Sequence, residues 1–300
     1  MRLSEHLNRL GLSNADAKKA LRSGKVFFHG IPTADGGRDV QPFQVEFKPD
    51  ATKLTPGRDM VIVHRDDDLV VIWKPSGMLS VPAGKPGGHL NVLGLAGKLL
   101  RGPALPVHRI DQSTSGLMMI ARNEEAQFKL KAQLEIHSVE RRYLAFVLGK
   151  PPAKNWTVKN HLVDDRGDGL RGSCEGPPPH FAKRAETSFI QLERIGKRAN
   201  IVEAKLETGR THQVRIHLSE GGLPILGDTR YTTTAAQRMA TRLCLHAVVL
   251  GIEHPTTGER LRFTSPLPDD MEQLRRGLVY EAKNPVVKRT KSKIPKKRRR

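Results

Sequence analysis

The sequence predicts an α+β fold, with a mixed, mostly antiparallel sheet in a large domain and a small α+β unit in front of it. Three observations lead to this prediction. Strand-like apolar segments clearly outnumber helical ones after about residue 60. Helical stretches lie between those strands at 124–137 and 213–219. The first 50 residues have helix and strand signals of their own and run into a segment with Pro and Gly, which is typical of a separate unit followed by a linker.

Two short helices are expected at the start of the chain. The segments 3–10 and 14–21 have leucine and alanine at helical spacing. Ser13 or Asn14 can cap the second helix, and Gly24 is placed to end it. These signals predict a pair of helices before the first strand.

A short strand pair completes the predicted N-terminal unit. Residues 25–30 are typical of a strand running into a turn, and residues 44–47 of its partner. We therefore expect an N-terminal unit over 1–50, a linker over 51–59, a large domain over 60–280 and a basic tail over 281–300.

The large domain is expected to consist mainly of strands. Residues 164–180 are rich in Gly, Pro and charge and predict a loop or a flexible hairpin tip, without the glycine spacing of a nucleotide site. Apolar segments predict strands over 61–63, 69–72, 117–120, 143–147, 185–192, 199–206 and 245–252.

The charge balance indicates a polyanionic partner. The chain has 51 basic and 31 acidic residues, a formal net charge of +20. Nine of the basic residues lie in 287–300, which has no acidic residue and almost no apolar content. Such a segment cannot bury enough surface to fold alone, so we expect it to be disordered when no polyanion is bound. The rest of the chain is basic as well, which favours a nucleic-acid partner.

Other bulk features exclude several classes of protein. No apolar run approaches the ~18 residues of a membrane span, and the start of the chain does not have the pattern of a signal peptide. We therefore expect a cytoplasmic protein with no membrane partner. Cys174 and Cys244 lie far apart, and His161, Cys174 and His180 are irregularly spaced, so neither a disulfide framework nor a metal site is expected.

The most informative segment is 105–121, where a polar loop runs directly into an apolar strand. A carboxylate at Asp111 is therefore held by a rigid element and can face a cleft, which suits a catalytic role. Thr114, Ser115 and Arg109 can lock the loop by hydrogen bonds to the backbone. Taken singly, an aspartate before a strand is more often a turn residue.

This segment closely resembles the catalytic loop of the RluA-type family of RNA pseudouridine synthases, whose pattern is His-Arg-Leu-Asp, then Thr-Ser-Gly and an apolar strand. Ile110 stands in for the leucine here, and Gln112 and Ser113 depart from the more usual charged residues. One further family motif precedes this segment, at Lys74-Pro75-x-Gly77. Others come after it in the family's order, at 141–149 with Arg141 in place of Lys, 208–217, 224–228 and 245–247. The first 50 residues resemble an S4 RNA-binding module.

The resemblance implies an isomerase that detaches uracil from ribose and rejoins it through carbon. It implies Asp111 as the catalytic carboxylate, attacking the base or the ribose or acting as a base. Arg215 is expected beside it as an ion-pair partner, because an opposite charge nearby keeps a carboxylate ionised. Tyr143 is expected to pack against the uracil and could help to remove the C5 proton. The expected substrate-binding residues are Leu245 as an apolar wall, together with Arg109, Arg210 and His212.

Alternatives remain open on the substrate. Ribosomal RNA of the large subunit is favoured by the S4-like unit and the basic tail, and tRNA is the second choice. A catalytically inactive, ribosome-associated RNA-binding protein is a further alternative, against which the joint presence of Asp111, Tyr143 and Arg215 argues. The reaction requires no redox centre, so we expect no cofactor, and we expect a monomer.

Overall fold

The N-terminal unit folds much as the sequence predicts in the computed structural model, which describes residues 1–82, 90–174 and 176–284. Ser13 caps the second helix by accepting a hydrogen bond from the backbone N–H of Asp16. Leu3 and Leu7 are fully buried, whereas Leu10 is 52 % exposed and lies outside the core. The elements of this unit are α1 (Leu3–Arg9), α2 (Asn14–Arg22), β1 (Val26–Phe28), β2 (Ile31–Pro32), a 3₁₀ turn (Pro42–Gln44) and β3 (Val45–Phe47). Both outer strands pair antiparallel with β1.

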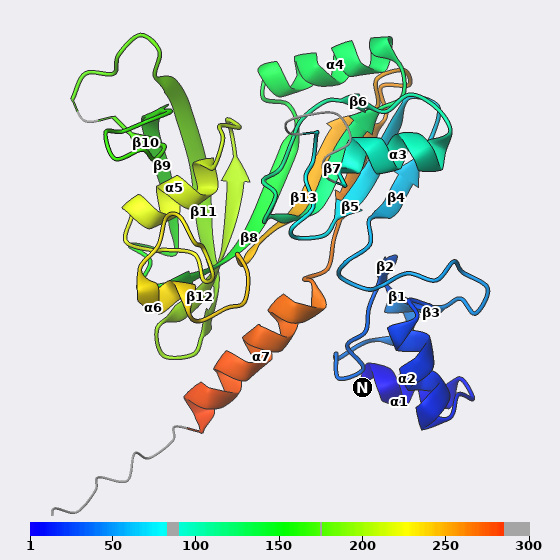
Figure 1. Ribbon diagram of the computed structural model, residues 1–300. Coiled ribbons are helices and arrows are strands. Elements are labelled where there is room, and N and C mark those ends of the chain that lie inside the picture. The colour runs from blue at the N-terminus through cyan, green and yellow to red at the C-terminus, as the bar shows by residue number, and fades with distance from the viewer. Residues whose placement is uncertain (83–89, 175, 285–300) are drawn as a thin grey trace, which may run out of the picture.

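One large sheet forms the rest of the protein, as Figure 1 shows. Its strand order is β10-β9-β11-β12-β8-β13-β7-β5-β4, with β14 paired to β13 and β6 to β7. All of the pairs are antiparallel except β13 with β7, so the predicted mixed, mostly antiparallel α+β fold is confirmed. The strands are β4 (Val61–Arg65), β5 (Leu69–Lys74), β6 (Leu105–Pro106), β7 (Ser115–Ala121), β8 (Glu140–Leu148), β9 (Asn155–Val163), β10 (Gly172–Ser173), β11 (Lys183–Ile195), β12 (Ala199–Leu206), β13 (Leu245–Glu253) and β14 (Arg260–Thr264).

Helices cover both faces of the sheet around β5 and β7. These helices are α3 (Val92–Leu100) and α4 (Glu124–Glu135). Alternate residues of β5 and β7 pack against α4 on one face and against α3 on the other. Strands buried on both faces read as continuous apolar runs, which explains the uninterrupted sequences of β5 and β7. The strand that carries the end of the Asp111 loop is therefore fixed from both sides.

Three further helices follow the central strands. They are α5 (Gln213–Glu220), α6 (Thr234–Gln237) and α7 (Asp269–Lys283). All three contribute side chains to the main core with β8, β11, β12 and β13. No helix in the described ranges 1–82, 90–174 and 176–284 is long and apolar enough to cross a membrane.

The N-terminal unit lies beside α7 (Figure 1) and is bonded to it. Asp269 accepts hydrogen bonds from the Thr33 hydroxyl at 2.6 Å and from Nη2 of Arg38 at 3.0 Å. Arg276 pairs with Asp35 further along α7. Helix α7 ends at Lys283, and the segment 287–300, expected to be disordered without RNA, lies outside the described residues.

Candidate active site

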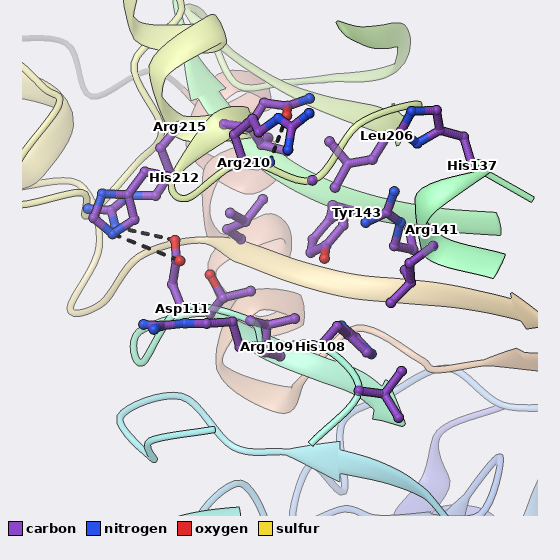
Figure 2. A pocket seen from close by; sticks show the side chains of 18 of the residues that line it. His108, Arg109, Asp111, His137, Arg141, Tyr143, Leu206, Arg210, His212 and Arg215 are labelled. Carbon is purple, nitrogen blue, oxygen red and sulfur yellow. Dashed lines mark hydrogen bonds and ion pairs between the residues drawn. The ribbon is translucent and has the colours of Figure 1, made fainter. Parts of the chain in front are cut away.

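The residues singled out from the sequence line one cavity of about 510 Å³. Figure 2 shows Asp111, Arg215 and His212 at one side of this cavity and Tyr143 further in. Seven residues that the sequence analysis assigned to the site contribute to its wall: Arg109, Asp111, Tyr143, Arg210, His212, Arg215 and Leu245. They come from the loop before β7, from β8, from the start of α5 and from the start of β13, so the fold brings together segments that are far apart in sequence.

Asp111 faces two basic side chains across the cavity. Its Oδ2 lies 3.4 Å from Nη1 of Arg215, and its Oδ1 lies 3.8 Å from Nε2 of His212. The side chain of Asp111 is 18 % exposed, so a substrate can reach the carboxylate. The predicted contact between Asp111 and Arg215 is thus present, although 104 positions separate them.

Arg215 is held in place by Asp228, a partner that the sequence analysis did not identify. Nε and Nη2 of Arg215 donate to the two carboxylate oxygens of Asp228, each at 2.8 Å. Burial by itself would lower the pKa of Arg215, but the bonded Asp228 outweighs it, so the pKa is raised. This two-point fork fixes the guanidinium plane and leaves Nη1 directed at Asp111.

His212 has an unusual backbone conformation at the beginning of α5. Its φ is 60°, in the left-handed region that few residues other than glycine adopt. Nδ1 of the ring lies 2.9 Å from the Tyr231 hydroxyl. Burial lowers the pKa of His212 and outweighs the opposing effect of Asp111, so the imidazole is neutral at neutral pH. The strained turn and the hydrogen bond together fix the ring next to the carboxylate.

Tyr143 and Leu245 form the apolar side of the cavity. Tyr143 is 8 % exposed and Leu245 is 3 % exposed, and β8 and β13, which carry them, are neighbours in the sheet. Burial raises the pKa of Tyr143 to about 12, so the phenol is neutral at neutral pH. Arg109 and Arg210 are exposed residues of the same cavity, and Nε of Arg210 donates to the Arg184 carbonyl at 3.0 Å.

The loop that carries Asp111 is fixed by residues 74–80 rather than by the neighbours expected from the sequence. Thr114 Oγ1 has no hydrogen-bond partner within the described residues. The hydroxyl of Ser80 instead donates to the Ile110 carbonyl at 2.6 Å. The fully buried Lys74 donates from Nζ to the carbonyls of Gln112, Pro75 and Met78 at 2.7–3.0 Å. The Lys-Pro-x-Gly segment therefore serves to position the loop that carries Asp111.

Burial lowers the pKa of Lys74 to about 7, and the nearby Asp111 opposes this shift. The three carbonyl acceptors favour the ammonium form, because a neutral amine has only two protons to donate. His108, at the start of the same loop, is half-buried, and its desolvation lowers its pKa to about 3. It is therefore neutral, and its Nε2 accepts the backbone N–H of Met119 at 3.1 Å. Lys74 and His108 thus both hold the loop that carries Asp111.

Comparisons with known proteins identify the family of this chain. Residues 68–220 match the family model described as RNA pseudouridylate synthase. An uncharacterized RNA pseudouridine synthase of Bacillus subtilis, YlyB, is 38 % identical over 74 % of this chain and 73 % of its own length. The ribosomal large subunit pseudouridine synthase D of Zymomonas mobilis is 37 % identical over 74 % of each chain.

Among solved structures, human RNA pseudouridylate synthase domain containing 4 superimposes with a TM-score of 0.59 at 25 % identity, covering 73 % of this chain and 92 % of the human one. Fold and cavity therefore define an RNA-modifying isomerase. The chain belongs to the RNA pseudouridylate synthase family, as its RluA-type motifs predicted.

Proposed function

We propose that Asp111 is the carboxylate with which this enzyme converts uridine to pseudouridine in RNA. The observation that supports this most strongly is the position of Asp111 in the 510 Å³ cavity, 3.4 Å from a buried arginine that a second carboxylate fixes. The guanidinium of Arg215 holds the Asp111 carboxylate in place and offers it an opposite charge when RNA closes the cavity and removes water. An ionised carboxylate can act on the ribose or on the base, as nucleophile or as base.

The other cavity residues divide into two groups. Arg215 holds Asp111 and its charge in place, and Tyr143 and Leu245 offer flat apolar surface to the uracil ring. Because Tyr143 is neutral at neutral pH, we assign it first to packing of the base. Accepting the C5 proton would need an anionic phenolate. Arg109, Arg210 and His212 lie where they can contact the RNA backbone beside the base.

The RNA must present an extruded base to this cavity. A uracil inside a duplex cannot reach Asp111, so the enzyme acts on an unpaired uridine or flips one out, at a cost of a few kcal/mol. Phosphate contacts of the basic surface offset that cost. The net charge of +20 is in keeping with such contacts.

We further propose large-subunit ribosomal RNA as the substrate, with tRNA as the second candidate. The relative from Zymomonas mobilis is named for the ribosomal large subunit, and the N-terminal unit has the helix and strand order expected of an S4-like module. That unit would guide RNA toward the cavity without supplying a catalytic group. The monomeric state and the cytoplasmic location stay predictions from the sequence.

The role of Asp111 is tested by tritium release from RNA labelled at C5 of uridine. The wild type should release tritium, and Asp111→Asn and Asp111→Ala should release none above background while they still bind RNA, because phosphate contacts supply most of the affinity. Asp67→Ala is the matched control, since the side chain of Asp67 is fully exposed and lies outside the cavity. Substantial turnover by Asp111→Ala would remove Asp111 from the mechanism.

The substrate is tested separately by mapping pseudouridine in total RNA. A strain lacking this gene should lose pseudouridine at defined positions of the large-subunit RNA. A wild-type copy should restore those positions, and a copy with Asp111→Ala should not. Loss confined to tRNA would refute the ribosomal proposal and leave the chemistry intact.

A further inference from the structure

Arg141 is a buried cation that faces the same cavity as Asp111. It lies in β8, two residues before Tyr143, and therefore on the same face of the sheet. Arg141 is 8 % exposed and lines the cavity. Figure 2 shows its side chain next to Tyr143, on the side away from Asp111. A Cβ at Gly209 would collide with Nη1 of Arg141, so the absence of a side chain at that glycine leaves room for the guanidinium.

The side chain of Arg141 makes no hydrogen bond to any residue that the structure describes. Its Nε is buried without an acceptor. The carboxylate of the nearby Glu207 pairs with Lys205 at 2.8 Å instead. Burial lowers the pKa of Arg141; Tyr143 and Glu207 oppose this shift, and the neighbouring Arg210 adds to it. A buried guanidinium without an acceptor is unfavourable, so an acceptor supplied by a ligand would be bound strongly.

The next residue in the strand, Arg142, provides a comparison, because its guanidinium has carboxylate partners within the protein. Arg142 points to the opposite face of the sheet. Its Nε donates to Glu140 at 2.7 Å and its Nη1 to Glu203 at 2.8 Å. Both arginines share one strand and one neighbourhood in sequence, but only Arg142 has carboxylate partners. Arg141 is thus the member of the pair that is free to bind substrate.

We propose that Arg141 donates a hydrogen bond to a carbonyl oxygen of the target uracil. This proposal rests on the function proposed above. The cavity that Arg141 lines also has the side chains of Tyr143, Leu206 and Val107 in its wall, against which a neutral base can pack. The exposed Arg109 and Arg210 lie at the same cavity and are better placed for the charged backbone.

The chemistry of uracil fits a fixed donor at this place. The ring has a carbonyl group on each side of N3. A half-turn about the axis through N3 and C6 therefore places one carbonyl oxygen where the other was. One immobile guanidinium can hold the ring before and after the rotation that isomerisation requires. Because arginine has donors only, it cannot accept a hydrogen bond from an amino group at the same position.

The first test separates substrate binding from a structural role. Arg141→Met should slow single-turnover tritium release by about ten- to a hundred-fold, as expected for loss of a hydrogen bond to a charged group. It should leave the urea midpoint of unfolding unchanged or higher, because no internal partner is lost. Arg141→Lys restores a donor and should recover most of the rate. Arg142→Met is the control: it should lower the urea midpoint and keep the rate.

The second test asks which part of the RNA is bound. The probes are two short RNA hairpins, one with the uridine that the wild type modifies and one with an abasic site at that position. Arg141→Met should weaken binding of the uridine hairpin and leave binding of the abasic hairpin unchanged. Equal weakening of both would overturn the proposal, since it would indicate a phosphate contact. So would a lower urea midpoint together with no rescue by lysine. Failure of the proposed function itself would be visible separately, as absence of tritium release by the wild type.

Discussion

Two arginine–aspartate pairs hold the two ends of the Asp111 loop with the same arrangement of atoms. In the cavity, Nε and Nη2 of Arg215 bind the carboxylate of Asp228, and Nη1 reaches Asp111. Behind the loop, Nε and Nη2 of Arg242 bind the carboxylate of Asp270, and Nη1 reaches the hydroxyl of Ser115 at 3.2 Å. Arg215 thus contacts the loop at Asp111, and Arg242 contacts it at Ser115.

The pairs differ in burial and in what the third donor meets. The side chains of Arg215 and Asp228 are 5 % and 1 % exposed, whereas Asp270 is 52 % exposed. Nη1 of Arg242 also donates to the Leu243 carbonyl, so its acceptors are neutral groups of the protein. Nη1 of Arg215 instead contacts the carboxylate of Asp111, which is exposed to the cavity. The same two-point hydrogen bonding therefore stabilises the loop at Arg242 and, by our account, supports the reaction at Arg215.

The largest expected difference between the pairs is in stability. Arg215→Met leaves Asp228 buried without a partner and should lower the free energy of unfolding by about 3–5 kcal/mol. Arg242→Met leaves the half-exposed carboxylate of Asp270 in contact with water and should lower the free energy of unfolding by about 1 kcal/mol or less. Urea unfolding of both variants measures the two values. Similar losses would mean that burial does not distinguish the pairs.

Lys74 extends the comparison, because its ammonium group holds the same loop through backbone carbonyls and has no carboxylate hydrogen-bonded to it in the described residues. Its pKa in the folded protein is about 7, against 10.5 in an ordinary lysine. Between these values the unfolded chain binds more protons, so the stability of the wild type should rise with pH, by at most ~1.4 kcal/mol per pH unit. Lys74→Met should lack this rise. The difference in unfolding free energy between the two proteins at pH 6, 7.5 and 9 tests it, and a constant difference would show that Lys74 keeps its proton.

A smaller effect is expected at the hydroxyl that Arg242 reaches. Ser115→Ala removes the partner of Nη1 and leaves Nδ1 of His246 without its hydrogen bond of 2.9 Å, so it should cost about 1 kcal/mol. Thr114→Val is the control, because Thr114 Oγ1 has no partner in the described residues, and it should be neutral or stabilising. A larger loss at Thr114 than at Ser115 would contradict the assignment of these bonds.

The sequence predicted the sheet and the cavity better than it predicted the partners within them. Buried strands such as β5 and β7 are continuous apolar runs, so their pattern is visible locally. Asp111 and Arg215 were paired through motif resemblance, and the structure confirms that contact. Strand β9 was missed, because its exposed residues Asn155, Thr157 and Lys159 are polar and interrupt the apolar pattern.

Asp228 and Arg141 were missed as site residues for a different reason. Both stand in segments that carried the family resemblance, 141–149 and 224–228, but the partner of Asp228 and the lack of one at Arg141 are fixed only by tertiary packing. The bond from Asp269 to the N-terminal unit joins residues more than 230 positions apart, and no local pattern carries that information.

The central claim is that Arg215, held by its two hydrogen bonds to Asp228, fixes the position of a catalytic Asp111. The most direct measurement is the single-turnover rate of tritium release at saturating RNA for Arg215→Lys and Arg242→Lys. Lysine keeps the charge in both variants but cannot form the fork. The account predicts a loss of about 100-fold for Arg215→Lys and a rate close to that of the wild type for Arg242→Lys. Equal rates for the two variants would contradict it.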